Sequence, residues 1–312
     1  MAREVQIDSP ARSEVAETLR LLVGGSRRDV AVAIRAEAFD RMIHRSGGGH
    51  WLLRGRRGGS DAGAALVVAS AGSVGMAFCS PPDAPGVDGQ CAAAALRAAA
   101  GLALDAGLSF VQTLLAPSRG ADVEAARAAG FERLAELVYM RREAGRPLGA
   151  AGGDEYVWRC YGDYGEAELI EVIQSTYTDS KDCPKLCGLR TMDDVIAGHK
   201  AGGIFSPRSW WIPTLGGRSA GCVLVNDSTA SPGDAELVYM GVGSAFRGRG
   251  LGRRMVGHAV EWVRQRNRGA LNVAVDSANH YAKRIYDAEG FEEVDRRLAL
   301  ILTSSARRSA GP

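Results

Sequence analysis

The sequence predicts an α/β (α+β) protein made of two similar halves, and three features predict it. Strand-like and helix-like segments alternate over most of the 312 residues. A Gly/Pro-rich stretch near the middle, residues 143–153, has a weak hydrophobic pattern and is typical of a linker. The segments on either side follow one another in a similar order. We therefore expect a domain at 1–145, a linker at 146–153 and a second domain at 154–312.

The second half has the clearer pattern. Leu251, Met255 and Ala259 recur at helical spacing, and the segment 271–275 alternates as a strand does. Gly290 follows another helical segment, as suits a helix C-terminus. The expected strands are 156–161, 209–214, 220–225, 236–242, 271–275 and 293–302, and the expected helices are 165–177, 191–201, 250–268 and 279–289.

The first half repeats this order in fainter form. The expected elements are strands at 64–70 and 74–79, a helix at 91–106, a strand at 110–115, a short helix and a strand through Met140. The short helix ends at Gly130-Phe131, which corresponds to Gly290-Phe291 in the second half. The two halves therefore look like a long-period duplication rather than a short repeat.

Composition excludes several classes of protein. The 38 basic and 36 acidic residues almost cancel, which argues against a nucleic-acid or membrane-surface partner for the whole chain. We expect no secretory signal, because residues 1–5 have no apolar core, and no stretch approaches the roughly 18–20 apolar residues of a membrane span. Six scattered cysteines are typical of a reducing cytoplasm, where we place the protein. Cys183 and Cys187 lack a second pair of ligands, so we expect no metal.

The densest chemical signal is a glycine-rich turn between a strand and a long helix. The turn, which we call the phosphate loop, reads Arg247-Gly248-Arg249-Gly250-Leu251-Gly252 and is followed by Arg253. Glycines let backbone N–H groups approach an anion closely, and the helix N-terminus adds unpaired donors. The loop lacks the Gly-Lys-Ser/Thr ending of a P-loop, and no early strand–helix–strand unit marks a dinucleotide fold.

At these residues the chain resembles the GNAT acetyltransferase superfamily, whose cofactor motif is Gln/Arg-x-x-Gly-x-Gly/Ala. Arg247, Gly250 and Gly252 match that motif, and residues 279–291 match a second family motif in the expected order. Ser244 stands where the family often has proline. The resemblance covers about 155–302 and implies tandem GNAT-type domains, each a mixed, mostly antiparallel sheet flanked by helices.

The resemblance also implies acetyl-CoA as the co-substrate. The phosphate loop and Arg253 would bind its pyrophosphate, and the backbone of Met240, Gly241 and Val242 would pair with the pantetheine amides as an added strand does. Asn279 would contact the pantetheine or phosphate region, although an Asn there is equally suited to capping a helix.

Two residues are candidates for the chemistry of acetyl transfer. Glu236, six residues before Val242, matches the glutamate that removes the amine proton in several GNAT enzymes, and its alternative is an ordinary strand-end glutamate. Tyr286 matches the tyrosine that can protonate the CoA thiolate, and its alternative is a packed core residue.

The acceptor is less well defined. In this fold the segment joining the first two helices usually roofs the acceptor cleft, and here that segment is 177–190. Tyr177, Asp182 and Trp211 are candidate contacts for a small polar amine or a peptide, although solvated loop residues and a core tryptophan would look the same.

The first half lacks these residues. Counting back from Gly130-Phe131 places Ala126 where Tyr286 lies and Arg119 where Asn279 lies. The segment that corresponds to the phosphate loop, residues 80–90, has adjacent prolines and two acids, which remove donors and repel phosphate. We interpret residues 1–145 as a degenerate GNAT-like domain, a layout similar to that of tandem enzymes such as mycothiol synthase.

The sequence thus favours an acetyl-CoA-dependent N-acetyltransferase acting on a primary amine of a small molecule or a protein N-terminus. The alternative is a non-catalytic CoA-binding sensor or scaffold. Such a protein needs only the phosphate loop, whereas this chain also has Glu236 and Tyr286.

Overall fold

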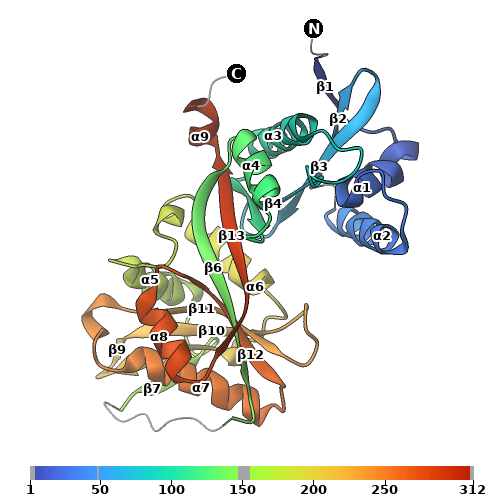
Figure 1. Cartoon of the computed structure of the whole chain (residues 1–312). Helices are drawn as coiled ribbons and strands as arrows, with labels where there is room; N and C mark the ends of the chain where they lie inside the picture. Colours follow the sequence, from blue (N-terminus) through green and yellow to red (C-terminus); the bar gives the residue numbers. More distant parts are fainter. Residues whose placement is uncertain (1–3, 48, 147–154, 310–312) are drawn as a thin grey trace. The chain divides into compact units, whose positions relative to one another are not determined.

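The computed structural model describes residues 4–47, 49–146 and 155–309, and it divides the chain into two compact units. Unit 1 comprises the described parts of residues 1–134 and 298–312, and unit 2 comprises those of 135–297. The chain passes from unit 1 to unit 2 within one strand, β6, and returns within another, β13 (Figure 1). No helix in the described ranges is long and apolar enough to cross a membrane.

Unit 1 is built on a mixed sheet of six strands in the order β1-β2-β3-β4-β5-β13. Neighbouring strands are antiparallel except β4 and β5, which are parallel. Its elements are β1 (Val5–Asp8), α1 (Val15–Gly24), α2 (Val30–Arg45), β2 (His50–Arg57), β3 (Ser60–Ser70), β4 (Val74–Cys79), α3 (Gly89–Asp105), β5 (Phe110–Leu115), α4 (Gly120–Ala128) and, after β13, α9 (Ser304–Ser309).

Unit 2 repeats the same plan, with its six main strands in the order β7-β8-β10-β11-β12-β6. Here too all neighbours are antiparallel except the fourth and fifth strands, β11 and β12. Its elements are β6 (Glu132–Glu143), β7 (Val157–Cys160), α5 (Glu166–Tyr177), α6 (Met192–Ala201), β8 (Trp210–Leu215), the short β9 (Arg218–Ser219), β10 (Gly221–Asp227), β11 (Ala235–Val242), α7 (Leu251–Gln265), β12 (Ala270–Asp276), α8 (His280–Ala288) and β13 (Glu292–Thr303).

The two sheets confirm the duplication expected from the sequence and show how each is completed. The sixth strand of unit 2 is β6, from the first half of the chain, whereas that of unit 1 is the end of β13, from the second half. The sequence places the boundary at 145/146, whereas in the described parts residues 135–146 belong to unit 2 and residues 298–309 belong to unit 1. Most of the expected linker, 147–153, lies outside the described residues.

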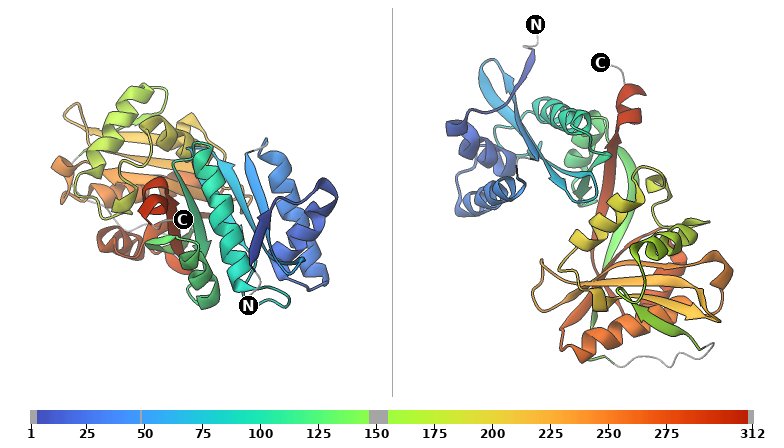
Figure 2. Two further views of the ribbon diagram at one scale, coloured as in Figure 1. Left: turned by 90° about the horizontal axis from the view of Figure 1, so that it is seen from above. Right: turned by 180° about the vertical axis from the view of Figure 1, so that it is seen from behind.

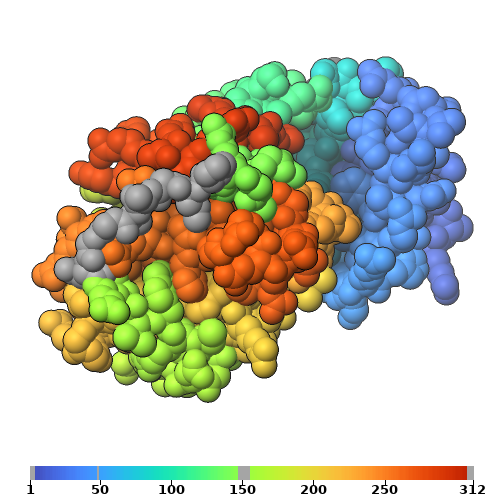
Figure 3. All heavy atoms as spheres, turned by 90° about the horizontal axis from the view of Figure 1, so that it is seen from below, coloured from blue at the N-terminus to red at the C-terminus, as the bar shows by residue number. Residues whose placement is uncertain are grey.

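Helices cover the two faces of the unit 2 sheet differently (Figures 1 and 2). On one face, apolar side chains of α7 and α8 form a large core with those of β10, β11, β12 and β6. On the other face, α5 and α6 pack on β8, β10 and β11. Polar residues on the outer side of α7 form part of the surface in Figure 3 (orange). The site described next lies where β11 meets α7 and α8.

Candidate active site

The sheet of unit 2 opens between its two parallel strands. β11 and β12 pair only at Ala235–Leu237 and Leu271–Val273. Beyond these residues β11 continues to Val242 along β10, and β12 continues to Asp276 along β6. A register irregularity opposite Leu224 and Val225 accompanies the divergence, as β-bulges bend the strand that carries them. The free edge of β11 can therefore pair with an extended chain of amides.

The phosphate loop presents a row of unpaired donors at the end of this strand. None of the backbone N–H groups of residues 248–253 donates to a carbonyl in the described parts of the chain. Gly248 and Gly250 have φ values of +78° and +75°, which L-residues rarely adopt, and the space where a Cβ would stand is open at both. The geometry therefore suits an anion at the N-terminus of α7.

Gly252, the third glycine of the motif, has a different role. A Cβ at this position would stand 2.9 Å from the Cδ1 atom of Ile285 on α8. The absence of a side chain lets α7 and α8 pack closely, which keeps both helices beside the loop.

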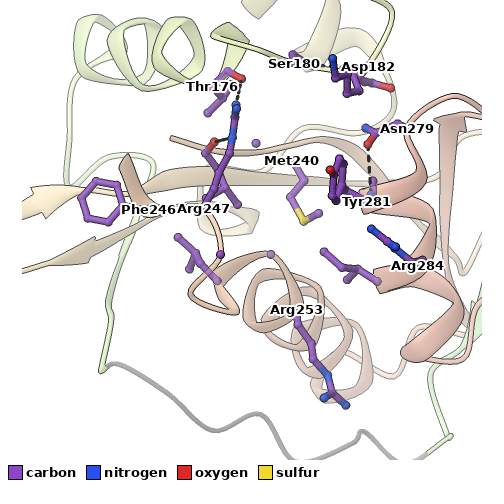
Figure 4. A pocket seen from close by; sticks show the side chains of 18 of the residues that line it. Thr176, Ser180, Asp182, Met240, Phe246, Arg247, Arg253, Asn279, Tyr281 and Arg284 are labelled. Carbon is purple, nitrogen blue, oxygen red and sulfur yellow. Dashed lines mark hydrogen bonds between the residues drawn. The ribbon is translucent and has the colours of Figure 1, made fainter. Parts of the chain in front are cut away.

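The arginines of the loop region are not equivalent. Arg247 donates from Nη2 to the carbonyl of Thr176 (2.9 Å) and from Nε to that of Val242 (3.2 Å), so it ties the loop to the end of α5. Arg253 pairs with the buried carboxylate of Glu289, and in Figure 4 its side chain points away from the other labelled residues. The expected free charge of Arg253 is therefore largely neutralised, whereas its backbone N–H remains available.

A cavity of about 840 Å³ runs along the free edge of β11 and over the phosphate loop (Figure 4). Most of the residues expected to bind the cofactor or the acceptor line it: Tyr177, Asp182, Met240, Gly241, Val242, Arg247, Gly248, Gly250, Leu251, Gly252, Arg253 and Asn279. Four expected residues do not: Arg249, Glu236, Tyr286 and Trp211. The volume is within the range of sites that bind drug-sized ligands and cofactors.

The segment 177–190, which covers one side of the cavity, is hydrogen-bonded to the end of β12. The backbone N–H of Asp276, at the end of β12, donates to Asp182 (3.4 Å), and that of Cys183 donates back to Asp276 (3.3 Å). Desolvation by the surrounding atoms raises the pKa of Asp182, a hydrogen bond from the Asp276 N–H lowers it, and the Asp276 charge raises it further. In the described parts of the chain, no group of three or more His, Cys, Asp or Glu residues could hold a metal ion.

Asn279 is the N-cap of α8. Its Oδ1 atom accepts from the N–H of Ala282 (3.3 Å). The capping interpretation of this residue is confirmed, and its place in the cavity lining is compatible with a contact to the cofactor as well.

The two candidate catalytic residues lie on opposite faces of the sheet, next to the point where it opens. Leu237 and Val273 belong to the core under α7 and α8, and so does Tyr286, which is only 4% exposed. Glu236 precedes Leu237, so strand alternation directs it to the other face, where Asn272 donates to it. Burial raises the pKa of Tyr286, with the charge of Asp182 as a smaller cause, which keeps the phenol protonated.

Trp211 has a packing role instead of the expected acceptor contact. It is 3% exposed and lies in the core under α7, where its ring meets His258 (centroids 4.7 Å apart) and Trp262 (5.8 Å) edge-on. Both faces of β8 are buried, so a tryptophan on either face is a core residue.

Two residues of α8 that line the cavity were not expected from the sequence. Tyr281 is 68% exposed, and the guanidinium of Arg284 lies 5.1 Å from its ring centroid. Arg284 has no carboxylate partner in the described parts of the chain, so it adds a cationic side chain opposite the loop. Helical spacing from Ala282 and Ile285, which also line the cavity, is the signal that could have identified this face of α8.

In the described part of unit 1, protein side chains fill the positions that correspond to the phosphate loop and to Asn279. At the start of α3, the Oδ1 atom of Asp88 accepts from the N–H groups of Gln90 (2.9 Å) and Cys91 (3.1 Å). Arg119, the N-cap of α4, pairs with Asp83 of the loop between β4 and α3 (2.8 Å). Carboxylates of the protein thus occupy the helix N-terminus that in unit 2 is free.

Comparison with known proteins identifies the second unit. Residues 173–291, which include the open strand edge, the phosphate loop and α8, match the family model "Acetyltransferase (GNAT) family". This match covers 119 of the 312 residues, all of them in unit 2. The matched segment has the pattern of the acyl-CoA-dependent acyltransferases of the GNAT type, a family whose enzymes use acetyl-CoA. A comparison with curated proteins found no match.

Solved structures show that the GNAT fold extends over the whole chain. A GCN5-related N-acetyltransferase from Sphaerobacter thermophilus is similar over 96% of this chain and 95% of its own, with 14% identity and a TM-score of 0.63. A tandem GNAT protein from the clavulanic acid biosynthesis pathway is similar over 99% of both chains, with 16% identity and a TM-score of 0.50. At these identities the likeness concerns the fold, and it supports two GNAT units.

Proposed function

We propose that unit 2 transfers an acetyl group from acetyl-CoA to a primary amine of a small molecule or of a protein N-terminus. The observation that carries the proposal is the continuous cavity that joins the free edge of β11 to the unpaired N–H groups of the phosphate loop. A strand edge for amides followed by a helix N-terminus for phosphates matches the order of groups in CoA.

The two candidate catalytic residues would act on the thioester from opposite faces of the sheet. A thioester at the opening of the sheet would have Glu236 on the face of α5 and α6 and Tyr286 on the face of α7 and α8. The amine approaches from the side of Glu236, which accepts its proton as the nitrogen–carbonyl bond forms. Tyr286 gives a proton to the departing sulfur as the carbon–sulfur bond breaks, so the acetyl group passes directly from sulfur to nitrogen.

The experiment is a screen of amines and peptides with detection of the released thiol, on the wild type and on Glu236→Gln. We expect Glu236→Gln to lower kcat/KM by roughly 10²–10⁴-fold, the usual scale of general acid–base catalysis. The affinity for acetyl-CoA should barely change, because Glu236 does not line the cavity. The loss should shrink as the pH rises and the free amine loses its proton unaided.

The outcomes separate the two functions considered for this chain. Tight CoA binding without thiol release by any amine or peptide would favour a non-catalytic CoA sensor. A Glu236→Gln enzyme with wild-type kcat/KM at neutral pH would remove Glu236 from the mechanism while leaving the transferase intact.

A further inference from the structure

A polar network lies next to Glu236 on the face of the unit 2 sheet that carries α5 and α6. Glu236 on β11 stands beside Asn272 on β12, and Asn272 stands beside Arg141 on β6, in register across three neighbouring strands. The Nδ2 atom of Asn272 lies 3.3 Å from Oε1 of Glu236, and its Oδ1 atom lies 3.5 Å from Nη1 of Arg141. The cavity lining does not include these residues, so contact with CoA does not explain the network.

Arg141 determines which way the amide of Asn272 faces. A guanidinium can only donate hydrogen bonds, so the amide atom that meets it must be the oxygen. The NH₂ group of Asn272 then faces Glu236, where it can donate to a carboxylate. With the amide reversed, the NH₂ group would face another donor and the oxygen would face the carboxylate, so both contacts would be repulsive.

Arg141 is itself held in place. It pairs with the buried carboxylate of Asp234, with a second contact of 3.4 Å from Nη2, and its Nε atom donates to Glu143 (2.8 Å). A guanidinium with partners on both sides loses little further freedom when it also orients Asn272. The network therefore runs from a buried anion, through a fixed cation and an oriented amide, to Glu236.

We infer that Asn272 is a positioning residue for Glu236 and that Arg141 sets its orientation. The inference rests on the proposed function, since it gives Glu236 the role of the base. Asn272 holds one carboxylate oxygen, Oε1, whereas no hydrogen bond to Oε2 is present in the described parts of the chain. One oxygen is thus anchored, and the other is available to accept a proton from the amine.

The first test measures the titration of Glu236 without any acceptor. The protein is labelled with ¹³C at the glutamate side-chain carboxyls, and the Glu236 signal is assigned by its loss in Glu236→Gln. In Asn272→Asp the donor is replaced by a second anion, so the midpoint of the Glu236 titration should rise by about 1–2 pH units. Asn272→Leu removes the donor without adding charge, so the midpoint of the Glu236 titration should rise by less than in Asn272→Asp.

A matched control and a functional readout accompany the titration. Asn267→Asp makes the same chemical change in an exposed turn after α7, where Asn267 has φ +53°, and it should leave the midpoint unchanged. The acid side of the kcat/KM profile should follow the midpoint in each Asn272 variant, while the acetyl-CoA dissociation constant stays constant. If Asn272→Asp does not fold, the Glu236 titration is compared between the wild type, Asn272→Leu and Asn272→Ser, whose side chain is smaller.

The results distinguish this inference from the proposed function. If the midpoint of the Glu236 titration is unchanged in both Asn272→Asp and Asn272→Leu, Asn272 has no positioning role, even if Glu236→Gln is inactive. A Glu236→Gln enzyme with full activity overturns the proposed base and with it the catalytic purpose of the network, even if the midpoints move.

Discussion

Substitution of Gly250 by valine separates phosphate binding from the general effect of backbone strain. Gly250 has φ +75°, and a Cβ there meets no protein atom within 4 Å. A valine would therefore not clash with the protein, but a left-handed conformation costs an L-residue about 1–2 kcal/mol. Its side chain would also occupy the open space beside the row of unpaired N–H groups, where we place the pyrophosphate.

The expected loss of affinity follows from the hydrogen bonds that this side chain displaces. A hydrogen bond to a charged group contributes about 1.5–3 kcal/mol, so the loss of one backbone-to-phosphate bond should weaken CoA binding about 10- to 150-fold. Calorimetric titration with CoA measures the dissociation constant, and thermal unfolding in the absence of CoA measures the cost of strain.

Gly107 provides the matched control for this substitution. It lies in unit 1, has φ +99°, and likewise has no atom within 4 Å of an added Cβ. Gly107→Val should lower stability by a similar amount and leave CoA affinity unchanged. A folded Gly250→Val protein that binds CoA as tightly as Gly107→Val would refute the assignment of the loop.

Three further predictions follow from the same structure. Calorimetry on the whole chain should find one CoA site, because Asp88 and the Arg119–Asp83 pair fill the corresponding positions of unit 1, and two equal sites would contradict this. Tyr286→Phe should lower kcat about 10²-fold or more with little change in melting temperature, a defect that higher pH does not relieve, and unchanged kcat would leave Tyr286 a core residue. Burial lowers the pKa of His258 and of His199 to about 4, below the unfolded value of about 6.5, so both bind protons more readily when unfolded. Stability should therefore fall as the pH drops from about 6.5 to 4, by up to about 1.4 kcal/mol per pH unit for each histidine, and His258→Phe should remove about half of that slope in acid unfolding curves.

The features that could be predicted from the sequence are those encoded over a few residues. The glycines of the phosphate loop were identifiable because only glycine readily adopts φ +78° and +75° beside an anion site. The long helix α7 and the strand β12 were identifiable because apolar residues recur every three to four positions in the helix and every second position in the strand.

The beginning of the chain was not predictable in the same way. Strand β2 contains Arg54, which is buried yet neutralised by Asp8, Glu14 and Asp61 from other segments. Such a residue breaks the hydrophobic pattern locally, and only the fold supplies its partners. Trp211 illustrates the opposite case, because a strand buried on both faces gives no sign of which side chain reaches a ligand.

The exchange of the sixth strands could not be predicted because β6 and β13 have interchangeable patterns. Both are 12-residue strands that follow a short helix and a Gly-Phe pair, and period and propensity do not specify which sheet each completes. A linker at 146–153 suggested separable domains, whereas the pairing of β6 with β12 crosses that boundary.

Through this exchange the first half of the chain contributes to the structure around the site of unit 2. Residues 137–143 pair along all of β12, and Val138 and Met140 lie in the core beneath α7 and α8. Arg142 donates to the carbonyl of Glu289 at the end of α8 (2.6 Å), so it caps the helix that lines the cavity. The network around Glu236 also depends on this strand, because Arg141 orients Asn272 from β6. We infer that the duplicated half contributes to catalysis through the strand that it lends to unit 2, while its own helix N-terminus is occupied by Asp88.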